Sequence, residues 1–166
     1  MSKLKRYNNN GNIYFVTNVT NNRNTILIDN STLLYDTLND IESRYNVILI
    51  AWVLLPDHFH LLIDTKDYNL SDLMQKIKLS FSKKYRFQLN VGGQIWQKRF
   101  WDHIIRNQLD MNAHIDYIHY NPVKHGYVKK PIDWKHSSFH KYLEEGFYND
   151  DWGVKDQIEI DGNFGE

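Results

Sequence analysis

The segment from Ile48 to Asp64, ILIAWVLLPDHFHLLID, constrains the fold of this chain more than any other. Two apolar runs meet at Pro56-Asp57, and both residues favour a tight turn, because proline fixes its φ angle and aspartate can bond its own backbone. We therefore predict two antiparallel strands, Val47 to Leu55 and His58 to Asp64. The first is apolar on both faces, so we expect it to be central in its sheet and covered on both sides.

Two histidines, His58 and His60, open the second of these strands. Side chains alternate faces along a strand, so both imidazoles are predicted to point the same way, about 7 Å apart, while Phe59, Leu61 and Ile63 point into the core. Two such imidazoles can bind one metal ion. A lone His-x-His pair is more often a hydrogen-bonded or surface pair, so the metal site needs support from elsewhere in the chain.

Composition limits what else the chain can be. A length of 166 residues indicates one domain. The chain has no cysteine, so a metal would have to be bound by histidine, amide or carboxylate groups. The first twelve residues contain no apolar signal segment, and no apolar run reaches the roughly 18 residues of a membrane span. We therefore expect a cytoplasmic protein that does not enter a membrane.

The net charge of zero hides an uneven distribution. Residues 1–143 hold 19 Lys and Arg against 12 Asp and Glu, a net +7, and residues 144–166 hold one Lys against eight acidic residues, a net −7. We predict a folded domain over 1–143 and an acidic, flexible tail over 144–166. A basic body favours a polyanionic partner, although an ordinary solvated surface explains this excess equally well.

The other elements follow from capping residues and periodicity. We predict a first strand over 12–19, helices from the N-caps Ser31 and Ser71, a fourth strand or paired segment over 95–106, a third helix over 110–121 ended by Pro122, and a short helix near 137–143. The order β-α-β-β-α-β is that of an α+β, ferredoxin-like split βαβ fold with a central antiparallel sheet. The third helix is then left to cover the face onto which the histidines point.

Tyr117 and Asn121 lie four residues apart on this third helix. They are therefore expected to project from one side, roughly 6 Å apart at Cβ. Asn121 can supply a third metal ligand through its carbonyl oxygen, and Tyr117 can supply a nucleophile for a phosphodiester. A free phenol has a pKa near 10, so Tyr117 needs a nearby cation or base to ionise at neutral pH.

Three stretches, AWVLLPDHFHLL, IWQKRFWDHIIRN and HIDYIHYNPVKHGYV, make the chain resemble the single-tyrosine, His-hydrophobic-His (HUH) transposases of the IS200 type. Among these it looks most like the branch associated with repetitive extragenic palindromes (REP). The resemblance implies that His58, His60 and Asn121 bind the metal, Mg²⁺ or Mn²⁺. It implies that Tyr117 is the catalytic nucleophile. It also implies nicking and joining of single-stranded DNA near hairpins, through a phosphotyrosine link.

The segment 95–106 mixes aromatic and basic side chains, a composition that suits single-stranded nucleic acid and also an ordinary sheet. The candidate DNA-binding residues are Arg99, His103, Arg106, Lys124 and Lys129. For His103, a structural place beside Trp101 is the stronger alternative.

Three other functions remain open from the sequence. The chain can be a hairpin-DNA-binding regulator that has lost cleavage, an RNA-binding sheet of the same topology, or a phosphohydrolase that uses water and leaves no protein–DNA link. The residues expected at the active site are all present, which argues against the first. Whether the protein acts as a monomer or a homodimer is left undecided.

Overall fold

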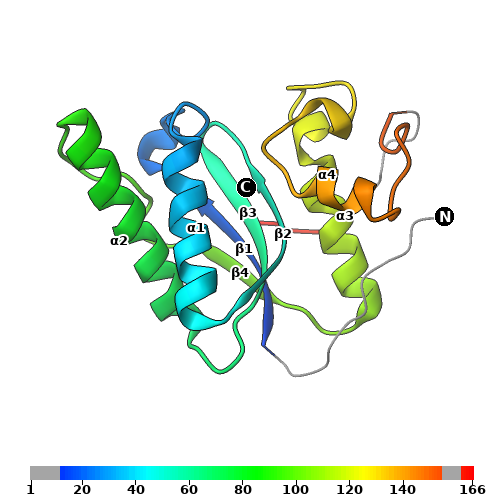
Figure 1. The fold of residues 1–166 in the computed structure, drawn as a ribbon, viewed down its shortest axis with the longest axis horizontal. Coiled ribbons are helices and arrows are strands. Elements are labelled where there is room, and N and C mark those ends of the chain that lie inside the picture. The colour runs from blue at the N-terminus through cyan, green and yellow to red at the C-terminus, as the bar shows by residue number, and fades with distance from the viewer. Residues whose placement is uncertain (1–11, 155–161) are drawn as a thin grey trace.

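A computed structural model describes residues 12–154 and 162–166 of the chain. It contains one four-stranded antiparallel sheet with the strand order β2-β3-β1-β4 (Figure 1). The elements are β1 (Ile13–Val19), η1 (Asn21–Arg23), α1 (Ser31–Tyr45), β2 (Ile48–Leu54), β3 (His58–Asp64), α2 (Leu70–Leu89), β4 (Trp101–Ile104), α3 (Gln108–Lys124), η2 (Pro131–Asp133) and α4 (Phe139–Glu144). This order confirms the predicted α+β fold.

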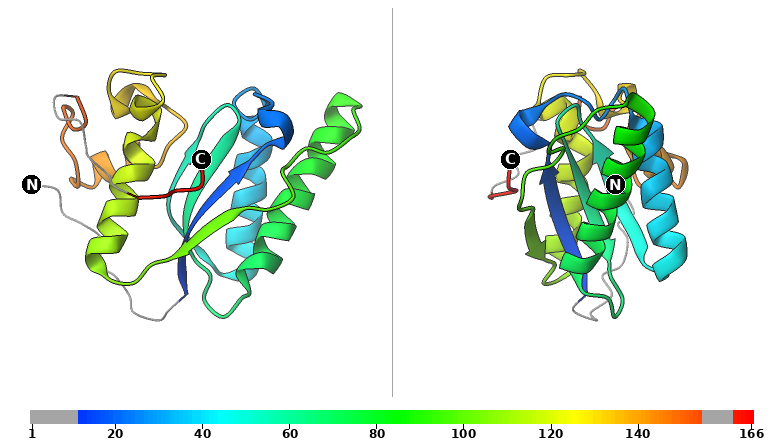
Figure 2. Two further views of the ribbon diagram at one scale, coloured as in Figure 1. Left: turned by 180° about the vertical axis from the view of Figure 1, so that it is seen from behind. Right: turned by 90° about the vertical axis from the view of Figure 1, so that its left-hand side faces the viewer.

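Both faces of the sheet are covered by helices. α1 and α2 cover one face and α3 covers the other, as the views from front and behind show (Figures 1 and 2). Alternation along β3 sends Phe59, Leu61 and Ile63 into the cluster under α1 and α2. Its histidines therefore face α3, as predicted.

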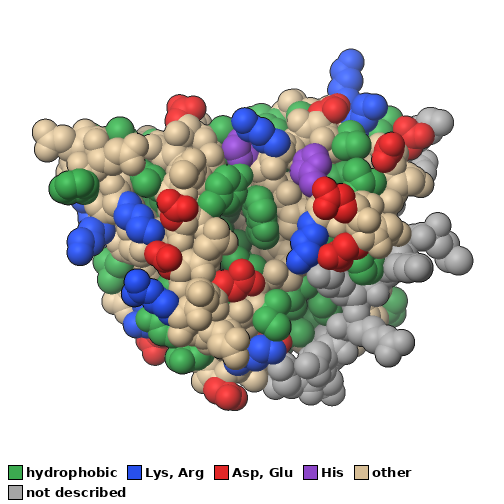
Figure 3. All heavy atoms as spheres, viewed as in Figure 1, with side chains coloured by type: hydrophobic (Ala, Val, Ile, Leu, Met, Phe, Trp, Pro, Cys, Tyr) green, Lys and Arg blue, Asp and Glu red, His purple; other side chains and the backbone are tan. Residues whose placement is uncertain are grey.

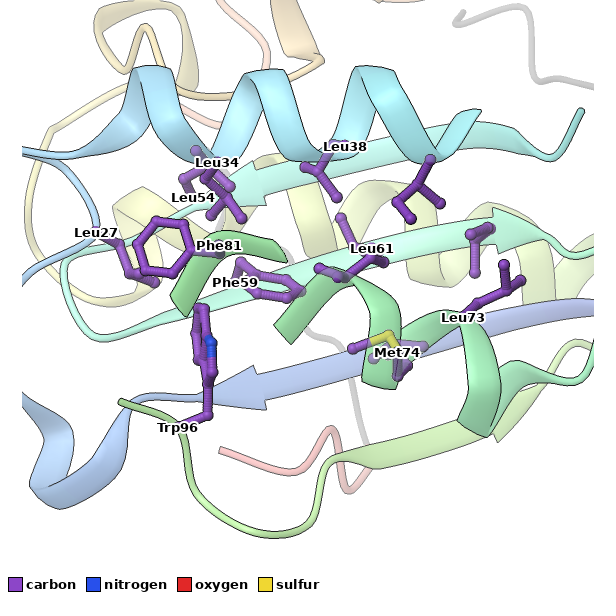
Figure 4. Packing of buried hydrophobic residues seen from close by; sticks show 14 of the residues in the cluster. Leu27, Leu34, Leu38, Leu54, Phe59, Leu61, Leu73, Met74, Phe81 and Trp96 are labelled. Carbon is purple, nitrogen blue, oxygen red and sulfur yellow. The ribbon is translucent and has the colours of Figure 1, made fainter. Parts of the chain in front are cut away.

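Leu61 lies at the centre of the cluster between the sheet and α2, close to Leu73 and Met74 (Figure 4). Its side chain is 0% exposed. We expect Leu61→Ala to lower the free energy of unfolding by about 2–5 kcal/mol, because the change leaves a cavity in a packed core. Leu79→Ala, at a residue of α2 that is 60% exposed, is the control and should change it by less than about 0.5 kcal/mol. Equal effects in urea denaturation would contradict this packing.

The prediction that the doubly apolar strand is central was wrong, because β2 lies at the edge of the sheet. The outer edge of β2 is covered by a later segment rather than by a strand. The Leu54 N–H donates to the His136 carbonyl, and the Ser138 N–H donates to the Trp52 carbonyl, both at 2.9 Å. The Tyr142 hydroxyl donates to the Ile50 carbonyl at 2.7 Å. An edge strand shielded in this way can be apolar on both faces.

The third helix does not end before Pro122 but continues to Lys124. A proline lacks one N–H donor, so close to a helix end it removes a single backbone bond. The His125 N–H still donates to the Asn121 carbonyl at 3.0 Å. The extension matters for the site, because Lys124 follows Tyr117 by seven residues and so lies on the same side of α3.

Other predicted boundaries also shift. The helix N-caps are Asn30 and Asn69 rather than the serines, and the Asn69 side chain accepts from the Asp72 N–H at 3.2 Å. β4 itself pairs with β1 over Trp101–Ile104. Earlier in the same predicted segment, Trp96 forms an isolated bridge with Thr20, and the Gln97 N–H donates to the Val19 carbonyl at 2.9 Å.

The described parts of the acidic tail pack against the domain. Tyr148 and Phe164 are buried in the cluster on the α3 side of the sheet. Seen from behind, the last segment crosses from α3 over the sheet (Figure 2). Residues 155–161, which also belong to the predicted tail, fall outside the described residues.

None of the helices within 12–154 and 162–166 is both long and apolar enough to cross a membrane.

Candidate active site

His58 and His60 both direct their Nε2 atoms toward the same point in the site. The His58 Nδ1 lies 2.6 Å from the Asp57 carboxylate, and the His60 Nδ1 lies 2.8 Å from the Thr17 hydroxyl. These contacts fix each imidazole and leave Nε2 for the site, as is usual for metal-binding histidines. The ring centroids are 5.0 Å apart. The predicted common orientation is thus confirmed.

His60 is suited to bind a metal ion at neutral pH. Its imidazole is fully buried, and this burial, together with the nearby His58, lowers its pKa to about 4, against an opposing effect of Glu166. At neutral pH the ring is therefore uncharged and offers a lone pair, which is the form that binds metal ions.

α3 brings Tyr117, Asn121 and Lys124 over the two histidines. The rings of His60 and Tyr117 are 5.4 Å apart. Two buried atoms, the His58 Nε2 and the Asn121 Oδ1, have no hydrogen-bond partner within the described ranges. Buried polar atoms are rarely left unpaired, so these two atoms fit a site completed by a metal ion.

A residue that the sequence did not suggest, Glu166, occupies the point where these side chains converge. Its Oε1 accepts a hydrogen bond from the Asn121 Nδ2 at 2.7 Å and lies 2.8 Å from the His60 Nε2. The Tyr117 hydroxyl donates to the same oxygen. Its Oε2 accepts from the Lys124 Nζ at 2.7 Å and lies 3.1 Å from the His125 Nε2.

The charge of Glu166 is stabilised by this setting. Burial alone would raise the pKa of the carboxyl, but the nearby imidazoles of His125, His58 and His60 outweigh burial and hold it well below its usual range. The carboxylate is thus an anion held at the centre of the site.

The residues before Glu166 hold it in place. The Phe164 ring stacks on the Tyr117 ring at 3.7 Å and 10°, and the Phe164 carbonyl accepts from the Thr17 hydroxyl at 2.5 Å. Gly165 has a φ of +74°, and a Cβ at this position would collide with the Trp101 side chain. Only glycine fits here without a shift of the segment.

Tyr117 has the cation that a phenol nucleophile needs. The Lys124 Nζ donates to the Tyr117 hydroxyl oxygen at 3.0 Å and lies 4.8 Å from the ring centroid. Burial, followed by the hydrogen bond and charge of Glu166, raises the pKa of Tyr117 well above its usual value. A hydrogen bond with Asn121 opposes this rise in the pKa. The ammonium of Lys124, in contact with the hydroxyl oxygen, is placed to stabilise a phenolate.

Two groups of side chains within the described residues could hold a metal ion. In one, the ligand atoms of His58, His125 and Glu166 lie within 4.8 Å of one another, and this group adjoins His60 and Asn121. The other consists of His103, Asp110 and His114.

His103 lies apart from Tyr117 and has structural partners. Its ring stacks on His114 at 4.8 Å, and its Nε2 lies 2.9 Å from the Asp110 carboxylate, which also accepts from the Arg106 backbone N–H. The ring also stacks on Trp101, 6.3 Å away. This favours the structural alternative for His103.

Of the five candidate DNA-binding residues, Lys124 alone has a described contact with Tyr117. Arg106 pairs with Asp110 at 3.3 Å, while Arg99 and Lys129 are exposed.

Four residues of the site were missed from the sequence: Thr17, Asp57, His125 and Glu166. Two of them carried a local signal, since Asp57 adjoins His58 and His125 follows Asn121 by one helical turn. Thr17 pairs with His60 across the β1–β3 ladder, which only the register of the sheet reveals.

Comparisons with known proteins agree with this fold. The family model described as "Transposase IS200 like" matches residues 9–121. The chain therefore belongs to the IS200-like transposase family, and it is an enzyme of the DNA transposase class.

Its relatives point to one branch of that family. A REP-associated tyrosine transposase of Escherichia coli K12 is 36% identical over 92% of this chain and 91% of its own. A Haemophilus influenzae protein provisionally given the same name is 36% identical over 98% and 99%. A solved structure of a REP-associated tyrosine transposase bound to a REP hairpin has a TM-score of 0.78 and 34% identity, covering 98% of this chain and 99% of that one.

Proposed function

We propose that this protein is a metal-dependent endonuclease and strand transferase that acts on single-stranded, hairpin-containing DNA through a covalent phosphotyrosine intermediate. One observation carries the proposal. The hydroxyl of Tyr117 converges with the imidazole of His60, the amide of Asn121 and the ammonium of Lys124 on a single anion, the Glu166 carboxylate. A site that gathers these groups around a carboxylate is built to gather them around a phosphate.

The chemical step is assigned to Tyr117. Its oxygen attacks the phosphorus, the bond from phosphorus to the 3′ oxygen breaks, and the 3′ oxygen gains a proton as the phenol loses one. Lys124 stabilises the phenolate through the contact already present at 3.0 Å. The link between tyrosine and the 5′ phosphate keeps the energy of the broken bond, so a 3′ hydroxyl can later reverse the step and join strands.

His58, His60 and Asn121 would hold the divalent ion. When bound, the ion would polarise the phosphodiester and offset the charge that develops on it. Both Mg²⁺ and Mn²⁺ suit phosphate chemistry, but two imidazoles favour the softer Mn²⁺. Asp57 and Thr17 act on this site indirectly, by fixing the two imidazole rings.

Two observations support a DNA partner, the charge of the domain and its similarity to a solved structure. Residues 1–143 carry a net +7, which favours a polyanion. The similar solved structure is of a transposase bound to a REP hairpin. A hairpin with single-stranded flanks is therefore the substrate to test first.

We expect His58→Ala and His60→Ala each to weaken Mn²⁺ binding at least about tenfold, because each removes one imidazole ligand. The free ion can be counted by electron paramagnetic resonance during a titration. His103→Ala is the matched control, since this histidine belongs to the other candidate metal group. Loss of Mn²⁺ binding in His103→Ala, with normal binding in both other variants, would contradict this assignment and place the metal at the group of His103, Asp110 and His114.

The alternative function is a non-catalytic hairpin-DNA-binding regulator. One observation favours it, because Glu166 fills the place that a phosphate would take. Tight hairpin binding by the wild-type protein without any covalent adduct, in Mg²⁺ or Mn²⁺, would support the regulator and exclude the transferase.

A further inference from the structure

A continuous row of aromatic rings leads out of the active site, and we call it the aromatic row. It starts at His125, whose ring is 5.2 Å from that of His58. Each further ring lies 5.4 to 6.1 Å from the one before it, in the order His125, Tyr127, Trp134, His136, Tyr35 and Trp52. The row joins residues of α1 and β2 to the segment that follows α3, so it connects surfaces far apart in the sequence.

Fixed partners hold Trp134, His136 and Tyr35 in this row, while Tyr127 is open to solvent. The indole N–H of Trp134 donates to the Leu54 carbonyl at 3.0 Å, and the Tyr35 hydroxyl lies 2.5 Å from the His136 Nδ1. Tyr127 stacks on Trp134 at 28° but is 46% exposed. A tyrosine that only filled a core would not leave so much of its surface in solvent.

The far end of the row opens into a cavity of about 780 Å³. Tyr35 and Trp52 line it, together with the polar side chains Asn39 and Glu42 and the cations Lys135 and Lys141. Figure 3 shows this face of the molecule, where hydrophobic side chains near the centre are bordered by basic, acidic and histidine side chains. The volume is typical of a ligand site that encloses a small molecule or a part of a larger one.

We propose that the aromatic row binds the single-stranded DNA that flanks the cleaved phosphodiester, with nucleobases stacked on Tyr127 and Trp134 and one base further along held in the cavity. The inference rests on the proposed function, because it needs a DNA strand at Tyr117. Rows of aromatic rings with nearby cations are how proteins bind unpaired nucleic acid. Lys124 at one end and Lys135 at the other can pair with the phosphates. The amide of Asn39 and the carboxylate of Glu42 can hydrogen-bond base edges.

The test measures binding rather than cleavage, in a protein that already carries Tyr117→Phe. Two fluorescent DNAs are compared by anisotropy, a hairpin with single-stranded flanks on both sides and the same hairpin with blunt ends. We expect Tyr127→Ala to weaken binding of the flanked hairpin about tenfold and to leave the blunt hairpin unchanged. Tyr127→Phe keeps the ring and should bind both like the parent protein.

A matched control is available in Tyr68, which is 45% exposed and packs against Tyr45 rather than in the aromatic row. Tyr68→Ala should bind both DNAs normally. A flank labelled with 2-aminopurine should show stacking as quenched fluorescence, and the quenching should be lost in Tyr127→Ala alone.

Two results would overturn the aromatic row as a DNA site. One is equal binding of the flanked hairpin by Tyr127→Ala and its parent, and the other is an equal loss for flanked and blunt hairpins. Failure of the proposed function gives a different result. In that case the wild-type protein would form no covalent adduct with the flanked hairpin, whether or not Tyr127 contributes to binding.

Discussion

Replacing Tyr117 with phenylalanine is expected to abolish the covalent protein–DNA adduct, with a loss of roughly a thousandfold or more in cleavage. The change removes the attacking oxygen and keeps the ring that stacks on Phe164. A labelled hairpin oligonucleotide with Mn²⁺, followed on a denaturing gel, measures the adduct directly. Binding of uncleaved DNA should be retained, because the phenol hydroxyl is only one of several groups at the site.

The neighbouring Tyr120 supplies the control for this change. It lies on the same helix, three residues from Tyr117, so a diffuse effect on α3 would appear in both variants. Tyr120→Phe should form the adduct at the normal rate. An adduct that persists in Tyr117→Phe and disappears in Tyr120→Phe would move the nucleophile to the other tyrosine.

Replacing Glu166 with alanine is expected to increase cleavage, by about tenfold or more. The carboxylate now takes the hydrogen bonds of Asn121 and Lys124 and the hydroxyl of Tyr117. A phosphodiester needs the same place and carries the same sign of charge, so the two compete. Initial rates of adduct formation with and without the substitution measure the effect.

Glu166→Ala should also change the pH dependence of adduct formation. The hydrogen bond and charge of Glu166 add to burial in raising the pKa of Tyr117, so they lower the phenolate fraction at any pH below that pKa. Removal of the carboxylate lowers the pKa, and the rising limb of the pH–rate profile should move toward lower pH. A faster rate with an unchanged profile would mean that Glu166 only blocks access.

Two further variants separate the effect of the Glu166 carboxylate from that of tail charge in general. Gly165→Ala keeps Glu166 but forces a Cβ against Trp101, so it should displace the segment and also raise cleavage. Glu145→Ala removes a carboxylate near Lys141, outside the site, and should leave the rate unchanged. A fall in cleavage in Glu166→Ala would show that the carboxylate serves the reaction instead of competing with it.

Much of the fold follows from patterns that act over a few residues. The alternation around His58 and His60 requires both rings to share a face whatever the rest of the chain does. The spacing of Tyr117 and Asn121 requires one side of a helix. The docking of α3 over the histidines follows from an apolar strand that needs cover on its second face. Together these three inferences predict that the metal ligands and the nucleophile meet at one site.

Other features depend on packing between distant segments, so no local pattern reveals them. β2 was expected at the centre of the sheet, because nothing nearby in the sequence shows that Ser138 and Tyr142 shield its edge. Glu166 reaches His60 across 106 residues of sequence. The extension of α3 through Pro122 also needed the structure, since the cost of a proline depends on how close it lies to the helix end.

The central claim is that Tyr117 faces a metal ion held by His58, His60 and Asn121. A crystal structure of Tyr117→Phe with a flanked hairpin and Mn²⁺ tests it most directly, because anomalous scattering distinguishes manganese from every protein and DNA atom. The account predicts a manganese peak bonded to both Nε2 atoms and to the Asn121 side chain, with a DNA phosphate between the ion and residue 117. A peak at His103, Asp110 and His114, with none between His58 and His60, would contradict it.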